Sequence, residues 1–260
     1  MSEKILVFIP TYNERRNAEK MCRALRALPF APDVLFVDDN SPDGTGAILD
    51  HLAAKDPAVH VVHRPGKQGI GTAHLFGIRW AYAQGYSKLM TLDCDFTHRP
   101  EYLPQFLEAS RECDFVISTR YGASPENLKD WTPYRRFLTR FGHILTTAML
   151  GMTLDATTSF RLYRLDRIPV EVFDDVQAAG YAFFFESAYI LHLAGFSIRE
   201  VPVVLPARQD GESKMNFAEV LASLRRFLRL FALRVMGPYR GYHQRRTAPR
   251  TQAKPTAAGR

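Results

Sequence analysis

The stretch KILVFIPTYNERRNAEKMCRALRALPFAPDVLFVDD, residues 4–39, indicates the fold class of this chain. Its first residues, Lys4–Ile9, form an apolar run that is typical of a buried strand. Apolar residues then recur at helical spacing, at Ala18, Met21, Cys22, Leu25 and Leu28. A second apolar run, Asp33–Asp39, ends in two aspartates. Strand, helix and strand in this order predict two parallel strands joined by a helix.

The same alternation continues along the chain. Further strands are expected at Val59–His63, Lys88–Asp93 and Asp114–Ser118. Further helices are expected to end at Ala54, to cover Thr72–Ala83 and to begin at Glu101. This order predicts the α/β class, with a Rossmann-like and mostly parallel sheet that carries helices on both faces. In such a sheet, ligands bind beyond the carboxyl ends of the strands.

Length and composition favour one globular domain. The chain has 260 residues, of which 46% are apolar, and this is enough for one substantial core. Its three cysteines are widely spaced and odd in number, which argues against a disulfide framework and for a reducing compartment. The N-terminal stretch lacks the pattern of a signal peptide, and no apolar run is long enough to span a bilayer. We therefore expect a cytoplasmic protein.

The net charge comes largely from the C-terminal end of the chain. Residues 237–260 contain six Lys or Arg and no Asp or Glu, so the formal net charge of +7 falls to +1 for residues 1–236. A nearly neutral domain lacks the broad basic surface by which proteins bind nucleic acid. We therefore expect no nucleic acid partner.

Polar residues follow each of the first four predicted strands. The segments are Pro10–Glu14, Val37–Thr45, Arg64–Ala73 and Asp93–His98. Glycines in the third segment let a ligand approach the backbone, and Lys67 adds a cation there. Each segment alone is a weak signal, because short Asp and Pro-Asp-Gly motifs are common in turns. Four of them at one edge of a sheet predict a ligand-binding site.

Asp93 and Asp95 stand on either side of Cys94, where the fourth strand is expected to end. Two carboxylates this close repel each other unless a cation lies near them. Oxygen ligands suit Mg²⁺ or Mn²⁺, and Mg²⁺ usually combines one or two carboxylates with substrate phosphates. We therefore predict a metal–diphosphate site. The alternative is that the two aspartates only solvate a loop or cap the next helix.

An ordered set of motifs makes the sequence similar to one enzyme family. The motifs are PTYNE (10–14), DDNSPDGT (38–45), GKQGIGTA (66–73), DCDFTH (93–98), STRY (118–121), TSFRLYR (158–164) and RQDGESK (208–214). In these the chain resembles the polyprenyl-phosphate mannosyltransferases of glycosyltransferase family 2, which have the GT-A fold. The resemblance covers about residues 5–214. It implies a GDP-mannose donor, a divalent metal, a polyprenyl phosphate acceptor and inversion at the anomeric carbon.

The resemblance also implies roles for individual residues. Those expected around the nucleoside and the rest of the donor are Pro10, Tyr12, Glu14, Asp39, Lys67, Asp93 and Cys94. The metal ligands would be Asp93 and Asp95. The residues expected to act in catalysis are Asp95, Arg120, Arg208 and Lys214. Cations at these places would stabilise the negative charge that develops on a departing diphosphate.

Three positions depart from the pattern of that family. Ser159 stands where a glycine is usual, Phe184 where an amide is usual, and Ala179 where a lysine is frequent. These changes affect the prediction of which sugar is transferred more than the prediction of the reaction class. A UDP-sugar donor such as UDP-glucose stays an alternative. So does an inactive nucleotide-sugar-binding subunit of a membrane-anchored partner.

The C-terminal part is predicted to divide into a helix and a tail. A catalytic domain over residues 1–214 would be followed by an amphipathic helix at 215–236 and a basic, disordered tail at 237–260. The apolar stripe of the helix consists of Phe217, Val220, Leu221, Leu224, Phe227, Leu228, Phe231 and Val235. Its other side carries Arg225, Arg226 and Arg229. This pattern predicts peripheral binding to the cytoplasmic membrane face. Packing on the domain core or on a partner helix is the alternative.

Overall fold

Seven strands form one sheet in the part of the chain that this computed structural model describes, residues 3–120, 143–144, 146–204 and 217–236. In chain order they are β1 (Ile5–Thr11), β2 (Asp33–Asp38), β3 (Val59–His63), β4 (Lys88–Thr91), β5 (Phe115–Thr119), β6 (Arg161–Arg164) and β7 (Ile198–Pro202). Their order in the sheet is β3-β2-β1-β4-β6-β5-β7. The strands expected from the sequence are confirmed, with ends that differ by at most two residues.

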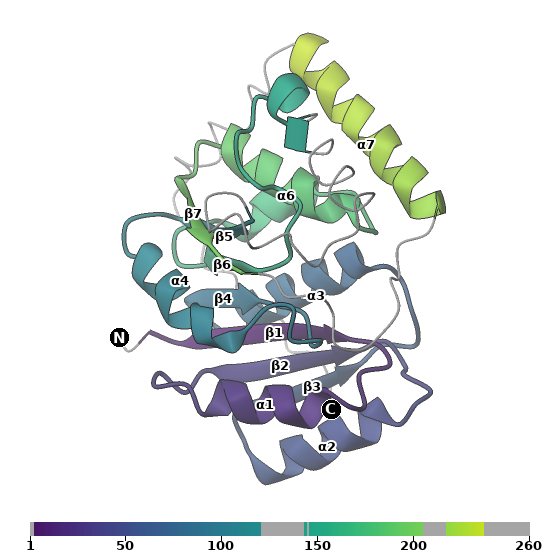
Figure 1. Ribbon diagram of the computed structural model, residues 1–260, viewed down its shortest axis with the longest axis vertical. Coiled ribbons are helices and arrows are strands. Elements are labelled where there is room, and N and C mark those ends of the chain that lie inside the picture. Colours follow the sequence, from purple (N-terminus) through teal and green to yellow (C-terminus); the bar gives the residue numbers. More distant parts are fainter. Residues whose placement is uncertain (1–2, 121–142, 145, 205–216, 237–260) are drawn as a thin grey trace.

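Helices cover both faces of this sheet. The α-helices are α1 (Ala18–Arg26), α2 (Thr45–Lys55), α3 (Ile70–Ala83), α4 (Leu103–Ala109), α6 (Ala182–Leu193) and α7 (Phe217–Met236). Shorter helical turns are η1 (Pro100–Tyr102), η3 (Thr146–Leu150) and η4 (Val170–Asp175). Figure 1 shows α7 along the outer side of α6, at the opposite end of the molecule from α2. Within the described ranges, no helix is both long and apolar enough to cross a bilayer.

Strand β1 shows how the sequence builds a core on each side of the sheet. Leu6 and Phe8 belong to the apolar cluster that includes α3 and α6, whereas Val7 and Ile9 belong to the cluster that includes α1, α2 and α4. All four side chains are fully buried. Successive residues of a strand point to opposite faces, so a continuous apolar run is buried on both. The predicted two-sided covering of the sheet is confirmed.

The sheet is mostly parallel, as predicted, with one strand that runs the other way. β1 pairs in parallel with β2 and β4, β2 with β3, and β5 with β7, whereas β6 lies antiparallel between β4 and β5. The sequence patterns did not predict β6 or β7. Arg161, the first residue of β6, lies opposite Thr91, the last residue of β4. The start of β6 therefore joins the edge where β1 to β4 end.

Helix α7 packs on α6 with one side and exposes much of the other. Phe227 and Leu230 are buried in the core, and the ring of Phe227 packs against that of Phe185. Five other apolar side chains are between 38% and 66% exposed, namely Val220, Leu221, Leu224, Leu228 and Val235. The expected single stripe is therefore divided between the domain and the surface. The placement of Arg226 on the outer side was wrong, because its side chain is only 13% exposed and is paired with Glu186.

Candidate functional site at the carboxyl edge of the sheet

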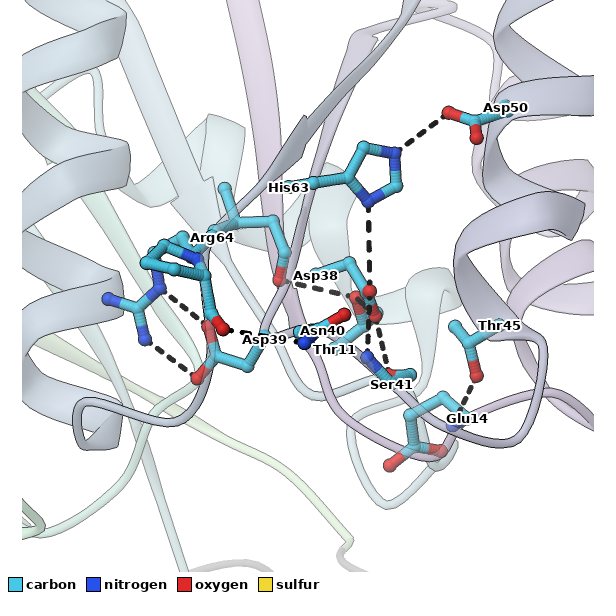
Figure 2. A network of polar contacts seen from close by, with 12 residues as sticks. Thr11, Glu14, Asp38, Asp39, Asn40, Ser41, Thr45, Asp50, His63 and Arg64 are labelled. Carbon is cyan, nitrogen blue, oxygen red and sulfur yellow. Dashed lines mark hydrogen bonds and ion pairs between the residues drawn. The ribbon is translucent and has the colours of Figure 1, made fainter.

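The four polar segments expected after the first strands lie along one edge of the sheet. β1, β2, β3 and β4 are linked by parallel pairing, so their carboxyl ends point the same way. Figure 2 shows the part of this edge formed by the ends of β1, β2 and β3. The predicted convergence of these segments is therefore confirmed, and the site can be described residue by residue.

Asp38, the last residue of β2, ties the turns after β1 and β2 together. Its buried carboxylate accepts hydrogen bonds from the hydroxyl of Ser41 at 2.5 Å and from the backbone N–H of Ser41 at 3.0 Å. The same hydroxyl of Ser41 accepts the backbone N–H of Asn13 at 2.9 Å. Asn13 has φ +59°, a left-handed conformation that asparagine tolerates better than most residues. These bonds fix the backbone directly after Tyr12.

His63, the last residue of β3, lies between two carboxylates (Figure 2). Its Nε2 is 2.9 Å from Oδ1 of Asp50 on α2, and its Nδ1 is 3.7 Å from Oδ2 of Asp38. The hydrogen bond to Asp50 raises the pKa of His63 above its usual value, with a smaller opposing effect of burial. His63 therefore links α2 to the end of β2, and protonation of its ring strengthens both contacts.

Asp39, expected near the nucleoside, is held by Arg64 of the third polar segment, a pairing that was not predicted. Arg64 donates from Nε to Oδ1 of Asp39 at 2.5 Å and from Nη2 to Oδ2 at 2.7 Å (Figure 2). Its Nη1 donates to the hydroxyl of Thr72, in the first turn of α3, at 2.9 Å. These two parallel hydrogen bonds hold the carboxylate of Asp39 in one orientation. The available signal for Arg64 was a charged residue directly after the apolar strand VHVVH.

Tyr12 and Lys67, from two different segments, come together at the same edge. The Nζ of Lys67 lies 4.0 Å from the centre of the Tyr12 ring, within the range of a cation–π interaction. Glu14 is anchored by its backbone N–H, which donates to the hydroxyl of Thr45 at 2.9 Å. Pro10 lies opposite Val37 within the sheet. The structure thus gathers these expected donor-binding residues, and their contact with a donor stays a prediction.

Asp93 and Asp95 follow β4, as expected, and differ in their surroundings. Asp93 is partly exposed, and its Oδ1 accepts the hydroxyl of Ser159 at 3.1 Å. Asp95 is largely buried, and its Oδ1 accepts the backbone N–H of Thr97 at 3.1 Å and the Thr97 hydroxyl at 2.5 Å. Part of the alternative therefore holds, because Asp95 does stabilise the local turn. The thiol of Cys94 is buried in the apolar core, and the expectation that Cys94 contributes to donor binding stays a prediction.

The acidic pair fits a metal that takes part of its ligands from the protein and the rest from a substrate. In the described ranges, no three His, Cys, Asp or Glu side chains form a set that could hold an ion by themselves. Asp93 is partly exposed and, within the same ranges, is paired with no Lys or Arg. Its Oδ2 is 3.6 Å from Nδ1 of His98. Two carboxylates completed by diphosphate oxygens are the arrangement that Mg²⁺ favours.

Arg120, expected to hold a phosphate, is engaged by a buried carboxylate. It donates from Nε to Oδ2 of Asp155 at 2.8 Å and from Nη2 to Oδ1 at 2.5 Å. Burial raises the pKa of Asp155, but the charge and hydrogen bonds of Arg120 outweigh it and hold that pKa below its usual value. Arg120 thus already has a carboxylate partner, and its role in catalysis stays a prediction. Arg208 and Lys214 lie outside the described residues.

Two residues of the later motifs belong to the core rather than to the site surface. Arg161 is fully buried and donates to five acceptors, the carbonyls of Thr158, Ala156 and Phe184 and the hydroxyls of Tyr163 and Ser187. The ring of Phe184, which replaces the usual amide, is also buried and lies 5.1 Å from the guanidinium of Arg161. This substitution therefore completes the packing around Arg161.

A mostly parallel sheet of this order, with an acidic pair at its carboxyl edge, is the architecture of GT-A glycosyltransferases. Two crystal structures share the fold at TM-scores of 0.60 and 17% sequence identity. One is glucosyl-3-phosphoglycerate synthase from Mycobacterium tuberculosis in complex with Mn²⁺, UDP and glucosyl-3-phosphoglycerate, covering 90% of this chain and 80% of that one. The other is mannosyl-3-phosphoglycerate synthase from Rubrobacter xylanophilus, covering 97% of this chain and 79% of that one.

Sequence comparison gives the family. The profile of glycosyl transferase family 2 matches residues 6–168, and the chain belongs to that family. It is 39% identical over 214 residues to the undecaprenyl-phosphate mannosyltransferase of Micrococcus luteus, covering 82% of this chain and 88% of the relative. It is 38% identical over 224 residues to the polyprenol monophosphomannose synthase of Mycolicibacterium smegmatis, covering 84% and 83%.

Proposed function

We propose that this chain transfers a mannosyl group from GDP-mannose to a polyprenyl phosphate, with inversion and with Mg²⁺ or Mn²⁺. The observation that carries this proposal is the likeness to the two relatives, whose names specify mannosyl transfer to a polyprenyl or polyprenol phosphate and whose sequences match over more than four fifths of their length. The acidic pair Asp93 and Asp95 at the carboxyl edge supports it, because a nucleoside diphosphate binds there in α/β sheets.

The reaction exchanges one glycosidic C–O bond for another. An oxygen of the lipid phosphate attacks the anomeric carbon of the mannosyl group, and the bond from that carbon to the β-phosphate of GDP breaks. A metal held by Asp93 and Asp95 would supply positive charge to the departing diphosphate. Lys67 would add a second positive charge at the same edge, where Tyr12 holds its ammonium group.

The acceptor explains why the site needs no strong base. A phosphate monoester has a second pKa of about 6 and is mostly dianionic at neutral pH. It therefore attacks without losing a proton to a side chain. What the enzyme must provide is orientation and compensation of charge. We assign that task to Arg208 and Lys214, as expected from the motif RQDGESK, and to Arg120 only in so far as Asp155 leaves its donors accessible.

The place of action follows from the acceptor and from α7. A polyprenyl phosphate keeps its chain in the bilayer, so the transferase must reach the membrane surface. Helix α7 exposes Val220, Leu221, Leu224, Leu228 and Val235 on one side, with exposed Arg225 and Arg229 next to them. We propose that this surface binds anionic lipid peripherally on the cytoplasmic face.

Transfer from labelled donors tests the proposal. The full chain is incubated with a polyprenyl phosphate, Mn²⁺ or Mg²⁺, and either radiolabelled GDP-mannose or radiolabelled UDP-glucose. We expect label in the lipid fraction with GDP-mannose alone, and loss of that label with EDTA. Label from UDP-glucose instead would overturn the proposed donor. Nucleotide binding without transfer from either donor would favour an inactive subunit.

A further inference from the structure

A buried ion pair joins α7 to the segment that precedes α6. Glu186, on α6, is fully buried, and its carboxylate accepts the backbone N–H of Gln177 at 3.2 Å and that of Ala178 at 2.8 Å. Its Oε1 also accepts Nη2 of Arg226 from α7. The Nη1 of Arg226 donates to the side-chain oxygen of Gln177 at 3.1 Å. Glu186 thus holds residues 177–178 in place, and Arg226 neutralises its buried charge.

Helix α7 meets the same segment at its other end. Glu219 accepts the backbone N–H of Tyr181 at 3.3 Å. A Cβ on Gly180 would lie 2.1 Å from Oε2 of Glu219, so α7 approaches the segment before α6 closely at this glycine. Helix α7 therefore contacts residues 177–181 in two ways. Glu219 binds the segment directly, and Arg226 acts on it through Glu186.

The far side of this segment caps α3. The carbonyl of Ala179 accepts the backbone N–H of Gly71 at 2.7 Å and that of Thr72 at 3.2 Å. These N–H groups lie in the first turn of α3, where a helix has no acceptor of its own. A Cβ on Gly69 would lie 2.4 Å from the carbonyl oxygen of Ala179, so the loop before α3 is pressed against the segment. At this position, Ala179 therefore caps α3 through its backbone carbonyl and not through its side chain.

The capped turn of α3 supports the donor-binding edge directly. The hydroxyl of Thr72 accepts Nη1 of Arg64, and the fork of Arg64 fixes Asp39. Lys67 lies on the loop between Arg64 and α3, over the ring of Tyr12. A displacement of the segment 177–181 would therefore shift the first turn of α3, the loop of Lys67 and the orientation of Asp39 together.

We propose that Arg226 and Glu186 are positioning residues for donor binding, and that α7 controls the affinity of the site for the nucleotide through them. The proposal rests on the proposed nucleotide-sugar site but concerns side chains outside it. Arg226 and Glu186 act only through the segment 177–181 and the first turn of α3. Loss of the ion pair therefore weakens donor binding, while the chemical step, which takes place at the end of β4, keeps its rate.

The experiment compares two variants of α7 that lose different contacts. Arg226→Met keeps the length of the side chain but removes the guanidinium that pairs with Glu186. Leu230→Ala, the matched control, removes a fully buried side chain of the same helix without altering that pair. Arg226→Lys is the conservative variant, because it keeps the charge. KM for GDP-mannose, kcat and the Kd of GDP by calorimetry are measured for each, with Tm as the record of stability.

We expect Arg226→Met to raise the donor KM and the Kd of GDP about tenfold with kcat little changed, and Arg226→Lys to restore most of the affinity. Leu230→Ala should lower Tm and leave the affinity near that of the wild type. Equal affinity loss in Arg226→Met and Leu230→Ala at equal loss of Tm would overturn the proposal, as would unchanged GDP binding in Arg226→Met. If Arg226→Met does not fold, Arg226→Lys and Gln177→Ala take its place in the same comparison.

Amide hydrogen exchange separates this proposal from the proposed function. The N–H groups of Gly71 and Thr72 should exchange faster in Arg226→Met than in Leu230→Ala, with no ligand present. A wild-type chain that does not bind GDP would refute the proposed donor. The exchange measurement would still show whether Arg226 acts on the first turn of α3. Equal exchange at both amides in the two variants would show that the ion pair of Arg226 does not act on α3 and would overturn the proposal.

Discussion

The hydroxyl of Ser159 donates a hydrogen bond of 3.1 Å to Oδ1 of Asp93. The two residues come from motifs far apart in the sequence, and they meet because β6 runs antiparallel beside β4. The carbonyl of Ser159 also accepts the hydroxyl of Thr91 at 2.6 Å, which holds Ser159 against the end of β4. The serine that replaces the glycine usual in this family therefore orients one of the two candidate metal ligands.

Loss of this hydroxyl should weaken metal binding. Partners that orient a metal ligand typically contribute tenfold or more to affinity, so we expect Ser159→Ala to bind Mn²⁺ about tenfold less tightly in the presence of GDP. Electron paramagnetic resonance of free Mn²⁺ measures this without activity. Ser110→Ala is the matched control, because it removes another buried serine hydroxyl, one that donates to the carbonyl of Leu107 on α4. The same Kd in both variants would contradict an orienting role for Ser159.

Asp95 requires a gentler substitution than its position in a loop suggests. Alanine would remove the metal ligand and also the acceptor for Thr97, at a cost of about 1 kcal/mol or more in the free energy of unfolding. Asparagine keeps an acceptor oxygen and removes the charge. We therefore expect Asp95→Asn to abolish mannosyl transfer with a Tm close to that of the wild type. Substantial turnover by Asp95→Asn at saturating Mn²⁺ would rule out Asp95 as a metal ligand.

The ion pair of Arg120 and Asp155 should matter for stability as well as for any role in catalysis. Arg120→Lys keeps the charge but cannot reproduce the two-pronged contact, and we expect a loss of about 1–3 kcal/mol in the free energy of unfolding at pH 7. Urea denaturation measures it. Arg111→Lys is the control, because its pair with Glu108 is well exposed and exposed pairs contribute about 0–1 kcal/mol. Equal effects of the two substitutions would show that the Arg120 pair contributes no more to the free energy of unfolding than an exposed pair.

The same pair predicts a dependence on pH. Folding lowers the pKa of Asp155, so its contribution to stability is present above the unfolded value of about 3.9 and is lost as the pH falls through the folded value. The difference between wild type and Arg120→Lys should therefore be constant from pH 7 to pH 5 and should shrink below about pH 4. A difference that stays the same down to pH 3 would mean that Asp155 is not the titrating partner.

His63 predicts a dependence of the opposite sign. Folding raises its pKa, so the stabilisation is fully present below the unfolded value of about 6.5 and is lost as the pH rises through the folded value. The Tm of the wild type should exceed that of His63→Gln at pH 6, and the excess should decline by pH 8.5. His51→Gln, on the exposed side of α2, is measured beside it as the control. A constant difference across this range would contradict protonation of His63.

Local patterns in the sequence were sufficient for the main architecture. The apolar runs and helical spacings of residues 4–118 reflect burial within single elements, and these appear in the structure nearly as predicted. Strands β6 and β7 were missed because charged residues interrupt them, as RLYR and IREVP, so neither forms a continuous apolar run. The split of α7 was missed for a different reason: periodicity shows which side is apolar but not how much of it the domain covers.

The candidate site was predicted as a set of segments rather than as contacts. Parallel strands place their carboxyl ends together whatever the side chains, so the convergence of the four polar segments followed from fold class alone. The pairs that fix the side chains did not, because Arg64 with Asp39 and Arg120 with Asp155 join residues 25 and 35 positions apart. No spacing rule within one helix or strand links residues at such separations.

Helix α7 provides the last prediction, which concerns binding to membranes. The domain covers Phe227 and Leu230 and leaves Leu224 and Leu228 about half exposed, at 46% and 50%. Exposed leucines of this kind can enter the acyl region of a bilayer, and each basic residue near an anionic surface adds roughly 1 kcal/mol. We therefore expect the full chain to sediment with vesicles that contain anionic lipid, and to do so less as the salt concentration rises.

Two pairs of substitutions separate the apolar from the electrostatic part of this binding. Leu224→Ser with Leu228→Ser should reduce sedimentation at every salt concentration, because it removes the groups that enter the bilayer. Arg225→Gln with Arg229→Gln should reduce it only at low salt. The control Arg23→Gln with Arg111→Gln removes two exposed charges on α1 and after α4, and it should have little effect. Equal losses from the two arginine pairs would mean that net charge, and not α7, attracts the protein. Equal sedimentation of the wild type with neutral and anionic vesicles at low salt would show that α7 is no electrostatic tether and would favour a partner protein on its exposed side.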